Sequence, residues 1–341
     1  MDLDVHYLRM SLLVNMSFDD IFEMWGGKYF LLYSYASILL ELGFPKEILP
    51  STFTLVGYLI LFRIFFDITK RSECDNSTTV FLLFLVVLLN DRFFGLSNGL
   101  RAGLAFHFAV LYIYSALYLE NKTSGKLSAV LSIIIHPAAS LPIFVFLLTR
   151  LTNRTQYYRY LLYASLIIFL LSEVLYYQLT SLLKPVLISL DLYSPTYFEA
   201  DGAWSGNISE HQSFKGYIFS TVFRGLPFYL MVLYLYFWKP IEEKSTKRFY
   251  HFLCFFSVVL SLLSTSYAIY QRYIFFYMIA FCFYYTINTL NVYQDRRSKL
   301  YLLVLLLALL NYNVATLYSF FDVVSQMFKP FLLIPLPFAL L

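Results

Sequence analysis

The stretch that decides the fold begins Ser97-Asn-Gly-Leu-Arg101-Ala-Gly-Leu-Ala-Phe-His107 and runs on as an apolar helix to Glu120. A turn at residues 121–126 follows, and the next apolar run is broken at His136-Pro-Ala-Ala-Ser140-Leu-Pro142. A charged side chain near the centre of a bilayer costs at least about 2.5–3.5 kcal/mol, so it is usually paired, faces a cavity or has a function. Arg101 and His136 therefore need an explanation in any membrane fold.

Composition assigns the chain to the membrane class. Of its 341 residues, 60% are hydrophobic and 13% are charged, whereas a soluble domain has about 25% charged residues. Several apolar runs approach the roughly 20 residues that cross a bilayer as a helix. The sequence predicts an all-α polytopic membrane protein, with a single integral membrane domain over residues 1–341 and about 9–11 transmembrane or re-entrant helices.

Eight apolar runs have the length expected of a spanning helix. They are residues 51–69, 79–97, 100–119, 160–179, 217–238, 249–268, 273–290 and 300–321. The run at 28–44 is shorter and fits either a spanning helix or one that lies in the membrane interface. Residues 331–341 are too short to cross alone.

Basic residues in short loops mark the cytoplasmic side of a membrane protein. The basic loops contain Lys70/Arg71, Lys122/Lys126, residues 239–248 and residues 294–299. The small net charge of +4 comes mainly from these loops, so the basic residues indicate which loops are cytoplasmic. No nucleic-acid partner is expected. This orientation places Arg101 near the outer face. It also places two acidic segments outside: the N-terminal residues 1–27 and the long loop at about residues 180–215.

The segment 127–148 leaves two topologies open. If it crosses once, Arg150, Arg154 and Arg159 lie outside, against the charge rule. If the break at His136-Pro137 makes a re-entrant hairpin, the three arginines are cytoplasmic. The two prolines remove backbone donors and flank the expected turn, which favours the hairpin.

A small set of polar residues lies within or beside apolar runs. These residues are Asp91, Arg92, Arg101, His107, His136, Glu173, Arg224 and Arg272. Arg101 either extends from a helix end to the headgroups or binds an anion, and Arg272 is either an interfacial anchor or a binding residue. His107 lies off the helical face of Arg101 and is expected to be a packing residue, whereas His136 beside a proline favours a function.

The other pairs also have two interpretations. Asp91 and Arg92 either pair with neighbours at a helix end or take part in a site, and Glu173 with Arg224 forms either an interhelical ion pair or part of a site. No His-x-x-x-His or Cys-x-x-Cys pattern occurs, and no carboxylate cluster has ligand spacing. No metal and no other cofactor is therefore expected.

The stretch Asn98-Gly-Leu-Arg101-Ala-Gly-Leu-Ala105, followed by Ile-Ile-Ile-His136-Pro-Ala-Ala-Ser140-Leu, resembles the EpsG family of Wzy-like exopolysaccharide, capsule and O-antigen polymerases. Gln271-Arg272-Tyr273 is similar to a second arginine segment of that family, and the acidic start with Asp4 is similar to its aspartate-and-tyrosine segment. The chain departs from the family pattern at Ala102, which replaces a glutamine, and at the proline after His136. It also begins where the family has already crossed once, so either a first helix is missing or the start codon is misplaced.

The resemblance implies a membrane glycosyltransferase. Such an enzyme joins oligosaccharide repeat units carried on undecaprenyl pyrophosphate, at the outer face of the bacterial inner membrane. A chain-length regulator is an expected partner. In this reading Arg101 and Arg272 hold the pyrophosphate, His136 is the candidate general base and Asp4 is a second candidate base.

Arg92 and Arg224 are further candidates for substrate binding. Two other classes remain open: a transporter or flippase for lipid-linked oligosaccharide, and a membrane O-acyltransferase that acts on glycan. The lack of repeated broken helices in the two halves argues against a transporter.

Overall fold

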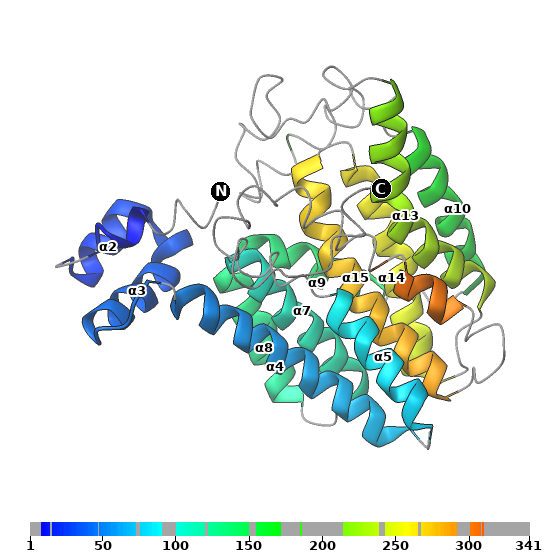
Figure 1. Ribbon diagram of the computed structural model, residues 1–341, viewed down its shortest axis with the longest axis horizontal. Coiled ribbons are helices and arrows are strands. Elements are labelled where there is room, and N and C mark those ends of the chain that lie inside the picture. Colours follow the sequence, from blue (N-terminus) through cyan, green and yellow to red (C-terminus); the bar gives the residue numbers. More distant parts are fainter. Residues whose placement is uncertain are drawn as a thin grey trace, which may run out of the picture.

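The part of the chain that the structure describes is all-helical (Figure 1). The computed structural model describes residues 8–13, 16–46, 48–72, 76–90, 100–119, 122–149, 155–171, 185, 214–238, 243–264, 267–291, 301–307 and 309. The main helices are α2 (Phe18–Trp25), α3 (Gly27–Glu41), α4 (Ile48–Arg71), α5 (Ser77–Asn90), α7 (Leu100–Tyr118), α8 (Lys122–Ile135), η1 (Pro137–Ala139), α9 (Ser140–Leu148), α10 (Thr155–Leu171), α13 (Phe214–Phe237), α14 (Lys244–Leu263) and α15 (Tyr267–Asn291). Within these ranges no strand occurs.

Helix length and composition agree with a membrane protein. Among the described residues, three helices are long and apolar enough to cross a membrane: α4, α14 and most of α15. Shorter apolar helices accompany them. The chain is therefore an all-α membrane protein, and the larger number of crossings stays a prediction. Helix α3 has 15 residues, or about 22 Å of helix, which is shorter than the roughly 30 Å hydrocarbon layer. Its length favours the interfacial alternative.

Helix α15 lies at the centre of the main bundle and is buried along nearly its whole length. Its neighbour α14 is antiparallel to it, because the ring of Phe249 lies 5.7 Å from that of Tyr284 and the ring of Phe256 lies 5.2 Å from that of Phe276. Helix α7 runs beside α15, with Phe106 also 5.6 Å from Phe276. A helix that is apolar all round, as α15 is, fits only a position surrounded by other helices.

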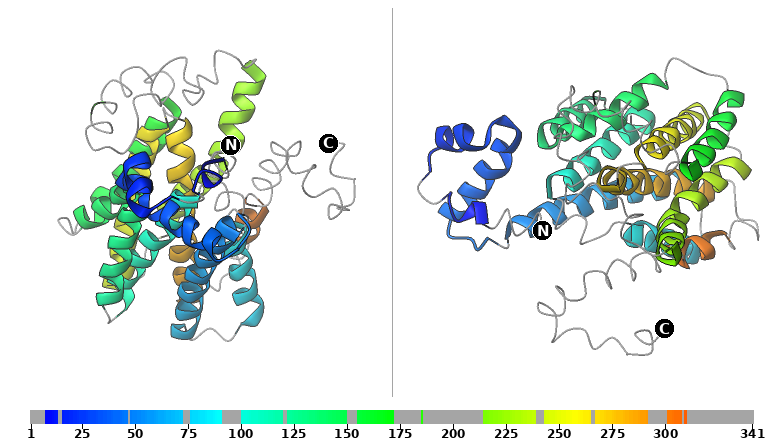
Figure 2. Two further views of the ribbon diagram at one scale, coloured as in Figure 1. Left: turned by 90° about the vertical axis from the view of Figure 1, so that its left-hand side faces the viewer. Right: turned by 90° about the horizontal axis from the view of Figure 1, so that it is seen from above.

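Helices α2 and α3 form a small unit beside the bundle (Figures 1 and 2) with a hydrophobic core of its own. Ser17 caps α2: its Oγ accepts from the Asp20 backbone N–H, and its own N–H and O–H donate to the Asp20 carboxylate. These bonds hold the pKa of Asp20 below its usual range. Gly26 has a φ of 66°, which favours glycine and lets the chain turn directly into α3.

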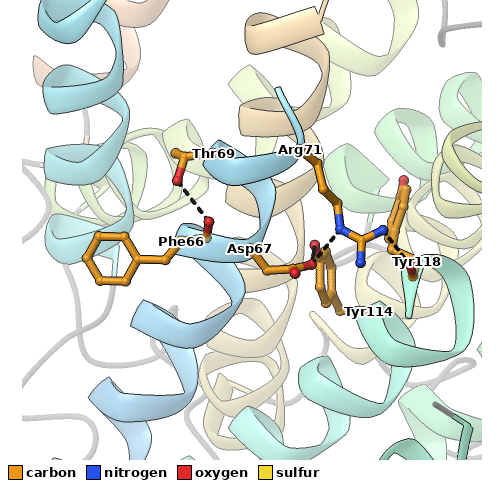
Figure 3. Close-up of polar contacts among 6 residues, drawn as sticks. All are labelled: Phe66, Asp67, Thr69, Arg71, Tyr114 and Tyr118. Carbon is orange, nitrogen blue, oxygen red and sulfur yellow. Dashed lines mark hydrogen bonds and ion pairs between the residues drawn. The ribbon is translucent and has the colours of Figure 1, made fainter. Parts of the chain in front are cut away.

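Two long-range contacts bring basic segments together at one end of the bundle. Arg71 at the end of α4 donates from Nη1 to the backbone oxygen of Tyr118 at 2.7 Å (Figure 3). Ser245 at the start of α14 donates to the oxygen of Leu117 at 2.8 Å. The ends of α4 and α7 and the starts of α8 and α14 therefore share one end, which we name the basic end. Three segments that the sequence places on the cytoplasmic side thus lie at the same end of the bundle: Lys70/Arg71, the start of α8 and the start of α14.

The segment broken at His136 turns back on itself. Helix α8 starts at the basic end, and at its far end the Tyr273 hydroxyl donates to the Ala138 oxygen at 3.0 Å. Tyr273 lies near the start of α15, at the end of the bundle opposite the basic end. Helix α9 then returns, because the Arg248 guanidinium at the start of α14 lies 5.0 Å from the Phe146 ring. The chain therefore reverses direction at the His136 break, which favours the hairpin, and its position in the membrane stays a prediction.

The next helix agrees with this hairpin. Helix α10 begins near the basic end, where Tyr158 stacks on His251 at 3.9 Å, and it runs away to Phe169, which lies 5.6 Å from Tyr270. Arg159 is exposed in the first turns of α10. Its side chain is therefore near the basic end, as the hairpin alternative requires. Arg150 and Arg154 lie outside the described residues.

Two sequence expectations about boundaries are wrong. Residues 122–126 are helical rather than part of a turn, because α8 already begins at Lys122. Gly125 faces α7 so closely that a Cβ there would lie 3.0 Å from the Ser115 Cβ, so this glycine permits helix contact. Helix α15 also starts at Tyr267, so Arg272 lies in its second turn rather than at its start. The expected outer loop at 180–215 falls almost wholly outside the described residues.

Candidate functional site

Arg101 is held at the start of α7 by aromatic residues from α3. Its guanidinium carbon lies 3.6 Å from the centre of the Tyr29 ring. Arg9 lies 5.3 Å from the same ring and donates from Nη1 to the Tyr33 hydroxyl at 3.1 Å. Tyr29 and Tyr33 stack on each other, one turn apart. We name Arg9, Tyr29, Tyr33 and Arg101 the arginine–tyrosine cluster. Stacking of this kind fixes a guanidinium while its edges remain able to donate.

Arg272 lies at the same end of the bundle as this cluster. Arg101 lies in the first turn of α7, and Arg272 lies in the second turn of α15. Their helices touch directly, since the rings of Phe106 on α7 and Tyr273 on α15 are 5.5 Å apart. Two cations at one end of the bundle favour an anion there, because each charge adds to the attraction. The two arginines that the sequence paired by function thus lie at the same end of the bundle, and their shared role stays a prediction.

His136 marks the break between α8 and α9 and is 7% exposed. Its extended backbone and the following Pro137 start the short helix η1, and its Nδ1 accepts from the Ala138 N–H at 3.1 Å. The same Ala138 accepts from the hydroxyl of Tyr273, the residue after Arg272. The structure therefore brings His136, Arg101 and Arg272 into one region, at the end of the bundle opposite the basic end.

The hydrogen bond to Nδ1 has a chemical consequence. A neutral imidazole has one acceptor nitrogen and one donor nitrogen. Because the Nδ1 of His136 accepts from the Ala138 N–H, the neutral ring carries its proton on Nε2. In this geometry Nε2 is a hydrogen-bond donor, and it is not available to accept a proton. The geometry therefore fits a donor role better than the predicted role of general base.

The remaining predicted residues divide into two groups. Asp4 and Arg92 lie outside the described residues, as do Asp91 and Glu173. Arg224 belongs to α13, where the structure describes its backbone alone.

His107 is fully buried, and its Nδ1 donates to the Gly103 oxygen at 2.8 Å, four residues earlier. Its ring also lies 5.8 Å from that of Phe275. This agrees with the predicted packing role.

Sequence reasoning missed Arg9, Tyr29 and Tyr33, because nothing local indicates that α3 lies against the start of α7. It also missed Gly95-Leu-Ser97-Asn-Gly99, which matches the Gly-x-Ser-x-Gly pattern of a nucleophile elbow. That motif needs a strand before the serine. These residues are outside the described part of the chain, so the match stays a sequence observation. Where side chains are described, no three metal-ligating residues lie close enough to hold an ion.

Comparison of the chain with protein-family models, with curated proteins and with solved structures finds no match.

The Tyr29 ring is expected to stabilise the arginine–tyrosine cluster measurably. Tyr29→Ala should lower the unfolding free energy by about 1–2 kcal/mol, because it removes a ring that contacts Arg9 and Arg101. Tyr29→Phe keeps the ring and should retain most of that stability. The apparent melting temperature of the purified chain in detergent measures both. Equal losses in the two variants would show that the hydroxyl, not the ring, matters.

Proposed function

We propose that this chain is a membrane glycosyltransferase that joins undecaprenyl-pyrophosphate-linked oligosaccharide repeat units into a surface polysaccharide, at the outer face of the bacterial inner membrane. The observation that carries the proposal is that Arg101, Arg272 and the His136 break lie at the same end of the bundle. Three helices that can cross a membrane also fit a lipid-linked substrate.

The arginine pair suits a diphosphate leaving group. A guanidinium donates two parallel hydrogen bonds to phosphate oxygens and stays charged at any physiological pH. Two such groups can neutralise negative charge that develops as the glycosidic bond to phosphate breaks. This stabilisation is larger in a site that excludes water. In this proposal Tyr29 holds the Arg101 guanidinium in place through its ring.

The proposed step is a displacement at the anomeric carbon of the donor sugar. A hydroxyl of the acceptor repeat unit forms a bond to that carbon, and the bond from the carbon to the diphosphate oxygen breaks with its electron pair on oxygen. The hydroxyl proton passes to a base, for which Asp4 is the remaining candidate of the sequence. His136 donates from Nε2 to the leaving diphosphate, in keeping with its occupied Nδ1.

Substitution of His136 distinguishes a role as hydrogen-bond donor to the diphosphate from a role as general base. In proteoliposomes loaded with lipid-linked repeat units, the chain should make a polymer ladder and release one undecaprenyl diphosphate per bond. His136→Ala should lower this rate by about 10²-fold, the loss typical of one transition-state donor. His136→Gln places an amide donor near the position of Nε2 and should keep the rate within about tenfold of wild type.

Other results of these assays would indicate a different role for His136 or a different class of protein. Equal loss in His136→Gln and His136→Ala would return the histidine to the role of base. Repeat units that cross the membrane without being joined would indicate a flippase. Transfer of an acetyl group to glycan without change in length would indicate an O-acyltransferase. Either of these two results would overturn the proposal.

A further inference from the structure

A cavity of about 290 Å³ lies between α4 and α7 at the basic end. Arg63, Asp67 and Lys70 line it from α4, with Phe66, while Leu111 and Tyr114 line it from α7. This cavity is at the far end of α7 from Arg101. It is therefore separate from the candidate site.

The carboxylate in this cavity is already engaged (Figure 3). Arg71 donates from Nε to Asp67 at 2.8 Å, and the Tyr114 hydroxyl donates to the same oxygen at 2.5 Å. Arg71 also holds the Tyr118 oxygen, so the group ties α4 to the end of α7. The negative charge of Asp67 is thus compensated by Arg71 and is not left to neutralise the other cations of the cavity.

Arg63 and Lys70 supply those other cations. Both side chains are exposed, and neither lies within ion-pair distance of a carboxylate in the described part of the chain. They are seven residues apart, which places them on one helix face. Arg63 lies about 12 Å along the helix from Arg71. A charge this far inside a spanning helix is costly unless a polar or anionic group meets it.

The apolar residues of the cavity differ in exposure. Phe66 is 59% exposed and lies on the same side of α4 as Arg63 and Lys70, while Leu111 forms part of the opposite wall. The volume is at the lower limit of about 300–1,000 Å³ for small-molecule sites. It fits a lipid headgroup and is too small for a lipid-linked glycan.

We propose that this cavity binds the phosphodiester headgroup of an anionic phospholipid. Arg63 and Lys70 contact the phosphate, Asp67 and Tyr114 lie beside the polar part of the headgroup, and an acyl chain runs along Phe66. Basic pockets between membrane helices at the positively charged side recognise such headgroups through the same chemistry. The proposal does not depend on the enzymatic activity proposed above.

Native mass spectrometry of the full chain, with phosphatidylglycerol or phosphatidylcholine added to detergent, tests this site. Wild type should bind phosphatidylglycerol much more tightly than phosphatidylcholine. Arg63→Gln/Lys70→Gln should weaken phosphatidylglycerol binding about 30-fold, from the attraction expected per cation near an anionic surface. Lys126→Gln/Lys244→Gln removes two exposed lysines from the same end, outside the cavity, and should bind as wild type does.

A charge-preserving variant distinguishes loss of the binding site from loss of the fold. Arg63→Lys/Lys70→Arg keeps both charges and should retain binding within about threefold. Equal weakening by the cavity and control variants would show diffuse attraction and overturn the site. Displacement of bound lipid by equimolar glycerol phosphate would show that a free phosphate compound is the ligand. Unchanged binding in Arg63→Gln/Lys70→Gln would also reject the proposal.

Discussion

Arg101→Ala and Arg272→Ala are each expected to slow polymer formation by about 10²–10³-fold, the loss found when one donor to a developing negative charge is removed. Cells that carry either variant should lack long polymer and accumulate single lipid-linked repeat units. The physical reason is the placement of both residues at one end of the bundle, where α7 and α15 touch through Phe106 and Tyr273 and where both guanidinium groups would act on one diphosphate.

Conservative and remote variants make this test specific. Arg101→Lys keeps the charge but loses the planar fork and the stacking on Tyr29, so an intermediate rate is expected. The double alanine variant should lose less than the product of the two single losses, because both residues serve one leaving group. Lys126→Ala, at the basic end, should make polymer of normal length. Normal polymer in either arginine variant would refute the assignment.

Gly125→Leu is expected to destabilise the fold most among single substitutions in the α7–α8 pair. Even a Cβ at this position would lie 3.0 Å from the Ser115 Cβ and 3.9 Å from the Tyr112 oxygen. A leucine must therefore push α8 away from α7, at a cost of about 1–3 kcal/mol. Because α8 leads directly to His136, activity should fall together with the apparent melting temperature.

Neighbouring substitutions separate helix contact from other effects. Lys126→Leu adds the same side chain one residue later, on an exposed position, and should leave the melting temperature nearly unchanged. Gly125→Ala should be destabilising alone and should be relieved by Ser115→Gly, which removes the atom it meets. If Gly125→Leu melts as wild type does, the close contact between α7 and α8 is not present.

The class of fold was predictable from the sequence because apolar length and charge placement are local signals. Lys70/Arg71, Lys126 and the basic segment before α14 were expected on one side, and the contacts of Arg71 with Tyr118 and of Ser245 with Leu117 bring those segments to one end. Whether residues 127–148 cross once was not predictable. The outcome depends on tertiary contacts of Ala138 and Phe146 with α15 and α14.

The candidate site was predictable in part for the same reason. Arg101, His136 and Arg272 stand out because a polar residue in an apolar run is costly. Tyr29 does not stand out, since aromatic residues are abundant at membrane interfaces. The donor role of His136 also depends on the bond from Ala138 to Nδ1, which no sequence pattern specifies.

The measurement that tests the central claim most directly is cross-linking from outside. Arg101→Cys and Arg272→Cys are introduced together, with Cys74, Cys254 and Cys282 replaced by serine and a protease site inserted at residues 120–121. A short, membrane-impermeant thiol cross-linker is then added to spheroplasts. The two fragments should stay joined after proteolysis, whereas Arg101→Cys with Lys244→Cys, from opposite ends of the bundle, should leave them separate. Fragments of the first pair that separate, or that join only in permeabilised membranes, would contradict a shared outward-facing site.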